Sequence, residues 1–210
     1  GDDSAGENLR SLARSESIDT SCLHVMSGTP TGRALIAVDG QAKNLIVVVP
    51  GANARLSPSE VLHATDAIAA ADVLLVQQEV PGDTVHAALH IAKQAGVVTI
   101  LNPAPSRPLD PATLALVDIV VPNEHERSEL GDVSAVRTLV VTEGERGALV
   151  VSNGSSRRIE PYRVEAVDTV AAGDAFCGAL AAALSHGTTL DDALDRACAA
   201  GALATLTAGA

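Results

Sequence analysis

Short apolar runs alternate with amphipathic segments from residue 72 to the end of the 210-residue chain. The apolar runs, bounded by turn residues, predict strands at 72–79, 97–102, 117–123, 137–144 and 147–154. The other segments predict helices at 82–96, around 110–116, and at 124–130, 174–186 and 190–206. Buried strands that alternate with helices are typical of an α/β fold, in which helices cover both faces of a mostly parallel sheet.

The first 71 residues show a different pattern. Residues 4–15 predict an amphipathic helix opened by Ser4, and residues 57–71 predict a second helix. Ser57 is expected to cap the second helix with Glu60 at its third position, which is the spacing of a capping box.

A β-hairpin is predicted between these two helices, at residues 32–49. Two β-rich runs flank the dipeptide Asp39-Gly40, and Asp-Gly between such runs is a strong hairpin signal. The hairpin stands apart from the alternating strands, so we expect it to form a small accessory sheet.

Composition narrows the classes of function. The chain carries a formal net charge of −12, which argues against nucleic acid as a partner because phosphate neutralisation needs clusters of Lys and Arg. Three scattered cysteines support neither a disulfide framework nor a zinc site. With no signal-peptide pattern and no apolar run long enough for a membrane span, we expect a cytoplasmic protein.

Candidate chemistry gathers after the predicted strands, because ligands of open α/β sheets bind at the carboxyl ends of the strands. Each polar residue there has an alternative interpretation as a loop or capping residue. The candidates are Gln77, Glu79, Asn102, Asn123, Glu124, Glu126, Thr142, Glu143 and Gly144.

Residues 168–174 give a sharper signal. Ala171, Ala172 and Gly173 leave room for close approach to the backbone where a helix begins, which favours an anion site. An aspartate beside an anion is unfavourable unless it serves as a base, so Asp174 is either that base or only the helix cap. The sequence contains neither a GxxxxGK[ST] motif nor a GxGxxG motif after a strand.

Six motifs resemble the ribokinase family of carbohydrate kinases, whose signature is DTxGAGD. The segment DTVAAGDAFCGAL matches that signature, and the others are GDDSAGENL, VPGANARLSP, NPAPSRPL, VDIVVPNEHE and VTEGERGAL. The resemblance implies a three-layer α/β sandwich with a small β lid, in which residues 1–31 and 51–210 form an incomplete kinase core. Residues 32–50 would be part of a lid sheet through which two subunits form a homodimer.

The resemblance also implies the reaction, which is ATP-dependent phosphorylation of D-ribose to D-ribose 5-phosphate. Asp174 would be the catalytic base, and the backbone N–H groups of Ala171, Ala172 and Gly173 would stabilise charge on the transferred phosphoryl group. Glu79 would contact the sugar together with Asp174.

The same resemblance assigns the binding of ATP, Mg²⁺ and K⁺. Glu126 would act on Mg²⁺ through water, and Asp168, the Val170 carbonyl and Gly209 would hold K⁺. The nucleotide would be bound by Asn123, Thr142, Gly144, Gly147 and Cys198. By itself, the residue type of Cys198 and of Cys177 favours a small core residue over a nucleophile.

Two other functions stay open. One is another sugar kinase of the same family, a fructokinase or a 2-keto-3-deoxygluconate kinase, and the other is a non-catalytic nucleotide-binding remnant. The match begins after the family's first strand and its glycine-rich sugar-binding loop, and it ends before the family's last helix. It also has only EHERSELGDVSAV where the family has an extra helix. We therefore expect an exposed apolar sheet edge, and no activity from these 210 residues alone.

Overall fold

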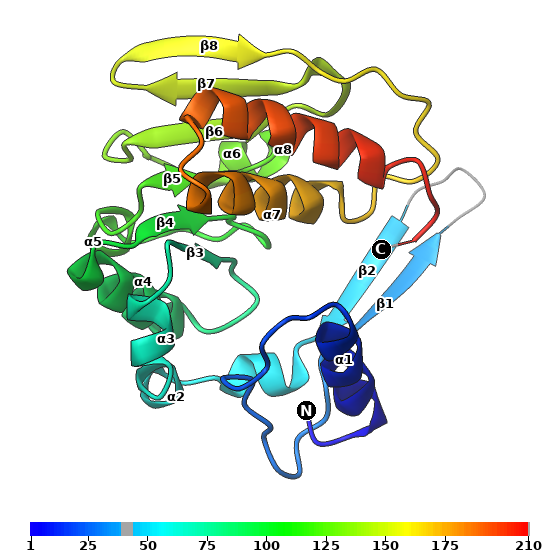
Figure 1. The fold of residues 1–210 in the computed structure, drawn as a ribbon. Coiled ribbons are helices and arrows are strands. Elements are labelled where there is room, and N and C mark those ends of the chain that lie inside the picture. The colour runs from blue at the N-terminus through cyan, green and yellow to red at the C-terminus, as the bar shows by residue number, and fades with distance from the viewer. Residues whose placement is uncertain (39–43, 210) are drawn as a thin grey trace.

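The computed structural model describes residues 1–38 and 44–209 (Figure 1). The turn predicted at Asp39-Gly40 lies outside the described residues. A six-stranded sheet and a separate two-stranded sheet form the framework. No helix in the described part of the chain is long and apolar enough to span a membrane.

The large sheet has the strand order β3-β4-β5-β6-β7-β8. Its strands are β3 Val73–Val76, β4 Val98–Leu101, β5 Ile119–Val120, β6 Thr138–Thr142, β7 Ala148–Ser152 and β8 Ser155–Ile159. The pairings between neighbouring strands from β3 to β6 are parallel. The pairings of β6 with β7 and of β7 with β8 are antiparallel. Residues 143–147 are too few for a parallel crossover, so β7 must turn back along β6. Our prediction missed β8, whose sequence SSRRI lacks the apolar positions of a buried strand.

Helices cover both faces of this sheet, so the predicted three-layer sandwich is confirmed (Figure 1). On one face, α7 Ala172–Ser185 and α8 Leu190–Ala204 pack through Leu180 and Leu194 against Val140 and Val150. On the other face lie α4 Gly82–Ala95, α5 Pro111–Leu114 and α6 Glu124–Glu129. The chain has one Phe, one Tyr and no Trp, so small and branched aliphatic side chains fill both layers.

The N-terminal segment contains α1 Ser4–Ser15 and the predicted hairpin, with β1 Arg33–Val38 antiparallel to β2 Asn44–Val49. The helix predicted at residues 4–15 is confirmed, and it begins at Ser4. Asp3 is the cap, because its Oδ1 accepts the Gly6 N–H at 3.0 Å. A short 3₁₀ helix, η1 Gly51–Arg55, leads from the hairpin to the sandwich.

The single helix predicted at 57–71 is wrong, because two short helices occupy this stretch. They are α2 Pro58–Leu62 and α3 Thr65–Ala69. The Thr65 hydroxyl donates to the Leu62 carbonyl where the helix breaks, at 2.7 Å. The predicted capping box is present, with Ser57 as the cap and Glu60 at the third position.

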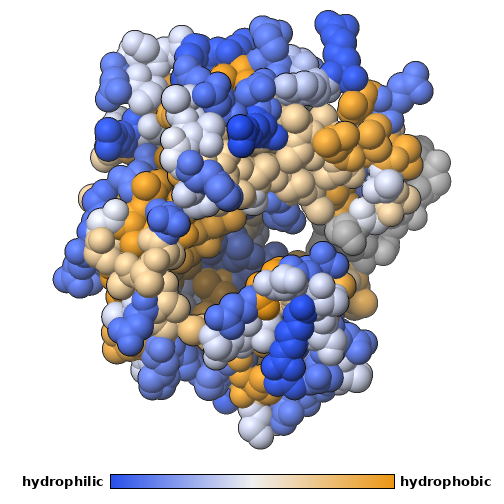
Figure 2. All heavy atoms as spheres, in the orientation of Figure 1, coloured by the Kyte–Doolittle hydropathy of each residue, from blue (hydrophilic) through white to orange (hydrophobic). Residues whose placement is uncertain are grey.

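Strand β3 forms one edge of the large sheet, and its sequence VLLV gives the apolar edge that we expected. Leu75 on this strand is 38% exposed. Figure 2 shows a hollowed surface between the part of the molecule that carries the large sheet and the part that carries α1, and hydrophobic side chains line some of it. The N-terminal segment therefore lies beside the sandwich without closing against it.

Candidate functional site

The N-terminus of α7 is built by residues 168–174. Ala171 caps the helix in the left-handed conformation, at φ 60° and ψ 4°, and its carbonyl accepts the first helical bond from the Ala175 N–H at 2.9 Å. Asp174 is the third residue of the helix, and its side chain is exposed. The alternative that Asp174 only caps the helix is therefore wrong, and its carboxylate faces solvent at the helix N-terminus.

The three backbone amides proposed for the anion site differ from one another. The Ala172 N–H donates to the Thr169 carbonyl at 3.3 Å, which is a long bond. For the amides of Ala171 and Gly173, no acceptor is present within residues 1–38 and 44–209. The positive end of the dipole of this 14-residue helix thus presents amide donors beside the carboxylate of Asp174.

Asp168 is held at the start of the same loop. Its Oδ2 accepts the Gly209 N–H and its Oδ1 accepts the Val170 N–H, both at 3.0 Å. These bonds, the one from Gly209 first, hold the pKa of Asp168 below its usual value. The structure thus brings together the three residues expected to hold K⁺, namely Asp168, Val170 and Gly209. Each carboxylate oxygen still has a lone pair available for a cation.

Asn123 and Glu126 begin α6 with a reciprocal capping box. The Glu126 N–H donates to Asn123 Oδ1 at 2.8 Å, and the Asn123 N–H donates to Glu126 Oε2 at 2.7 Å. Asn123 also forms a parallel bridge with Thr142, which places both at the carboxyl edge of β5 and β6. The capping interpretation of Asn123 and Glu126 is confirmed by these bonds, which leave Oε1 of Glu126 outside the cap.

The Cys177 thiol is buried in the second turn of α7. Burial raises the pKa of Cys177 to about 12, and the negative charges of Asp174 and Glu126 add to this rise. Both carboxylates therefore lie close enough to the first turns of α7 to act on the same thiol. The charges of two acidic groups from distant parts of the sequence therefore both affect this thiol.

Other predicted nucleotide-binding residues have structural roles. Gly147 adopts φ 81°, and a Cβ there would lie 2.1 Å from the Ile159 carbonyl oxygen, so only glycine fits. Gly144 begins a second 3₁₀ helix, η2 Gly144–Arg146, at φ 58°. Cys198 is only 8% exposed within the core, where burial and Asp195 raise its pKa to about 11. The interpretation of Cys177 and Cys198 as core residues is confirmed.

Glu79 is an exposed residue of the loop that follows β3. Strand β3 is three strands from β6, which corresponds to about 14 Å at the usual strand spacing. Glu79 is therefore at the other end of the carboxyl edge from Thr142 and Gly144. The separation leaves the width of two strands for ligands between them.

Our sequence analysis missed two features. Gln78 is 2% exposed, and its Oε1 has no hydrogen-bond partner in the part of the chain that the structure describes. A hollow of 660 Å³ lies over β6 and β7, away from α7, and its apolar floor includes Leu139, Val141, Leu149 and Val151. Leu139, Val141, Leu149 and Val151 occupy alternate positions of β6 and β7 and therefore share one face of the sheet. The short connection after α6 leaves little chain to fill the space over that face.

Comparisons with known proteins agree with this arrangement. The model of the pfkB family carbohydrate kinase matches residues 1–210. A ribokinase from Staphylococcus aureus is 38% identical over 85% of this chain and 64% of its own length. One from Haemophilus influenzae is 37% identical over 100% of this chain and 74% of its own length. A deoxyribokinase from Salmonella typhi is 34% identical over 86% of this chain and 65% of its own length.

Solved structures show the same fold. A ribokinase from Thermotoga maritima superposes with a TM-score of 0.86 at 31% identity, over 100% of this chain and 74% of its own. A ribokinase from Arabidopsis thaliana, solved in complex with ribose and ATP, gives a TM-score of 0.84 at 26% identity, over 100% and 75% of the two chains. The chain thus spans about two thirds to three quarters of the length of these relatives.

Proposed function

Because the chain belongs to the pfkB family of carbohydrate kinases, we propose that it carries the phosphoryl-transfer site of an enzyme that phosphorylates D-ribose at its 5-hydroxyl with ATP. The observation that carries the proposal is the exposed carboxylate of Asp174 beside the amide donors of Ala171 and Gly173. Phosphoryl transfer depends mainly on positioning and on stabilisation of charge, and these groups supply both.

Asp174 is the proposed base. Its carboxylate would accept the proton of the attacking sugar hydroxyl, while the amides at the start of α7 would stabilise the charge on the transferred phosphoryl group. Glu79 is the proposed sugar contact. Asn123, Thr142, Gly144, Gly147 and Cys198 are proposed for the nucleotide side. For Gly147 and Cys198 this role would come through the backbone, since one lacks a side chain and the other side chain is buried.

The proposed cations fit the donors that are present. Mg²⁺ usually binds one or two carboxylates together with phosphates and waters, so Glu126, with Oε1 outside its cap, fits a contact through water. Asp168 and the Val170 carbonyl offer oxygen donors that suit K⁺. When bound, Mg²⁺ would neutralise charge on the phosphates.

The test is a comparison of Asp174→Asn with the unchanged protein. The chain covers 64% of the Staphylococcus aureus relative, so turnover is measured on a chimera that joins residues 1–210 to the flanking parts of the Haemophilus influenzae relative. We expect ATP affinity within twofold and turnover lowered by at least about 100-fold, the range of a lost general base. Retained turnover would refute the role of Asp174.

The sugar itself is tested with a panel of ribose, 2-deoxyribose, fructose and 2-keto-3-deoxygluconate. 2-Deoxyribose is the second candidate, because a deoxyribokinase is among the relatives. Release of ADP that depends on ribose supports the first proposal. Binding of ATP without turnover on any sugar would instead favour a nucleotide-binding remnant. Faster turnover in K⁺ than in Na⁺ is expected if Asp168 holds the cation.

The hairpin is proposed as part of a lid and as a dimer surface. Leu35 is 63% exposed and Val48 is 61% exposed, although both belong to strands. Exposed apolar strands are typical interaction surfaces. Light scattering should find a dimer that Leu35→Lys dissociates, and a monomer in the unchanged protein would refute this role.

A further inference from the structure

Residues 1–55 form a segment with few connections to the rest of the molecule. Among the element pairs of the described residues that share extensive contacts, only β1 with β2 involves this segment. The chain itself connects the segment to the sandwich at Arg55 and Leu56. Within residues 1–38 and 44–209, one ion pair also joins the two parts. The chain connection and this pair are therefore the polar links, among the described residues, between the hairpin-bearing segment and the sandwich.

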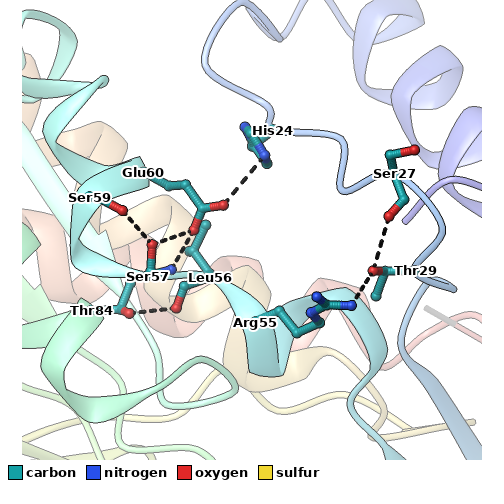
Figure 3. A network of polar contacts seen from close by, with 9 residues as sticks. All are labelled: His24, Ser27, Thr29, Arg55, Leu56, Ser57, Ser59, Glu60 and Thr84. Carbon is teal, nitrogen blue, oxygen red and sulfur yellow. Dashed lines mark hydrogen bonds and ion pairs between the residues drawn. The ribbon is translucent and has the colours of Figure 1, made fainter.

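The ion pair joins His24 to Glu60 (Figure 3). His24 Nε2 lies 3.4 Å from Glu60 Oε1, and the side chains are 48% and 19% exposed. His24 belongs to the irregular stretch between α1 and β1, whereas Glu60 lies in the first turn of α2 on the sandwich side. The pair thus joins a loop of the segment to a helix of the core.

Glu60 is held in place by its own helix. Its Oε2 accepts the Ser57 N–H at 2.6 Å and the Ser57 hydroxyl at 2.7 Å, which leaves Oε1 directed at His24 (Figure 3). On the segment side, Arg55 Nη1 donates to Thr29 Oγ1 at 2.8 Å and so joins η1 to the stretch that carries His24. The two halves of the contact are each fixed locally, and in the part of the chain that the structure describes the ion pair is the polar contact that spans them.

We propose that His24 and Glu60 form a proton-controlled latch that fixes the hairpin-bearing segment against the α/β sandwich. The charged groups around it are His63, whose charge acts on Glu60, and Arg55, which is bonded to Thr29. Under the proposed function, the latch positions the lid over the sugar site. The inference of a latch does not depend on that function, because it is drawn from the contacts between the segment and the sandwich.

The pH range of the latch follows from the chemistry of its two groups. An imidazole gains its charge as the pH falls through about 6.5. Bonds from the Ser57 hydroxyl and then the Ser57 N–H hold the pKa of Glu60 below its usual value, so the carboxylate stays ionised into the acid range. Because the ion pair requires a protonated imidazole and an ionised carboxylate, it is favoured in mildly acidic solution and weakened in alkaline solution.

The test measures a distance between the two parts. Cys22 is exposed while Cys177 and Cys198 are buried, so spin labels attach to Cys22 and to an added cysteine, Gln94→Cys, on α4. We expect the distribution of label-to-label distances to be at least twice as wide at pH 8 as at pH 5.5. The distribution should be wide at both pH values in His24→Gln and in Glu60→Gln. The second variant keeps the capping box, because glutamine also serves at that position.

Rescue and control variants separate a latch from a general loss of structure. His24→Lys keeps a charge at both pH values and should give the narrow distribution at both. His63→Gln and His125→Gln should respond to pH like the unchanged chain. The second removes another exposed pair, His125 with Glu129, that lies within α6.

A width independent of pH in the unchanged chain would overturn the proposal. So would an unchanged response to pH in His24→Gln and Glu60→Gln, once equal thermal midpoints show that both are folded. Neither measurement involves catalysis, so the outcome does not depend on the sugar kinase proposal.

Discussion

Ala171→Gly should stabilise the protein, although replacing alanine by glycine at a helix usually does the opposite. Ala171 holds φ 60° and ψ 4° at the start of α7, a left-handed conformation that costs an alanine roughly 1–2 kcal/mol. Glycine adopts it without this strain. The family signature DTxGAGD accordingly has glycine where this chain has Ala171.

The size of the effect is the difference between two contributions. Relief of the strain favours the variant by roughly 1–2 kcal/mol, and the greater freedom of glycine in the unfolded chain opposes it by about 0.4–1 kcal/mol. The free energy of unfolding should therefore rise by about 0.5–1 kcal/mol. For a chain of this size that corresponds to a rise in the melting temperature of about 1–4 °C.

The assay is urea unfolding, with Ala182→Gly as the matched control. Ala182 is an exposed residue in the interior of the same helix, so the identical change there should lower the free energy of unfolding by about 1 kcal/mol. Opposite signs for the two variants support the assigned backbone conformation. A loss of stability in Ala171→Gly comparable to that in Ala182→Gly would refute it.

Three further predictions concern other parts of the fold. Gly147→Ala should destabilise the chain by more than about 3 kcal/mol in the same assay, because its Cβ would lie 2.1 Å from a backbone oxygen of the neighbouring strand. With a thiol reagent at pH 8, Cys22 alone should react in the folded chain, and three thiols should react after unfolding, because burial raises the pKa of Cys177 and Cys198. Asp118→Asn should cost about 2 kcal/mol at pH 7. Burial raises the pKa of Asp118, but the hydrogen bonds from Lys93 and Thr99 lower it by more, so the pKa in the folded protein is below its usual value. The cost of the substitution should therefore disappear as the pH falls through that lowered pKa and the carboxylate is protonated.

The order of strands and helices could be predicted because burial imposes a pattern on the sequence. Runs such as VVTIL and TLVVT consist of aliphatic residues and threonine, since most side chains on both faces of those strands are buried. Strand β8 carries no such signal, because SSRRI lies at the sheet edge, where polar side chains reach water. The break between α2 and α3 could not be predicted either, because a pattern of apolar positions persists across a two-residue interruption.

The candidate site could be predicted in part. The rule for carboxyl ends of strands selected Asn123, Glu126 and Thr142, and the structure does place them at one edge. The rule could not show that Asn123 and Glu126 bond to each other, because capping and ligand binding select the same residue types. It also missed the latch, since nothing in the sequence around His24 indicates that Glu60 lies opposite it.

Strand β3 affects how the protein behaves in concentrated solution. Its outer row of peptide groups has no neighbouring strand in the described part of the chain, and its side chains Val73, Leu74, Leu75 and Val76 offer no charge that would repel another strand. Such an edge is a template on which a second polypeptide can extend the sheet. Aggregation should accordingly start at this edge, and a single lysine in place of Leu75 should raise the concentration at which the chain stays in solution.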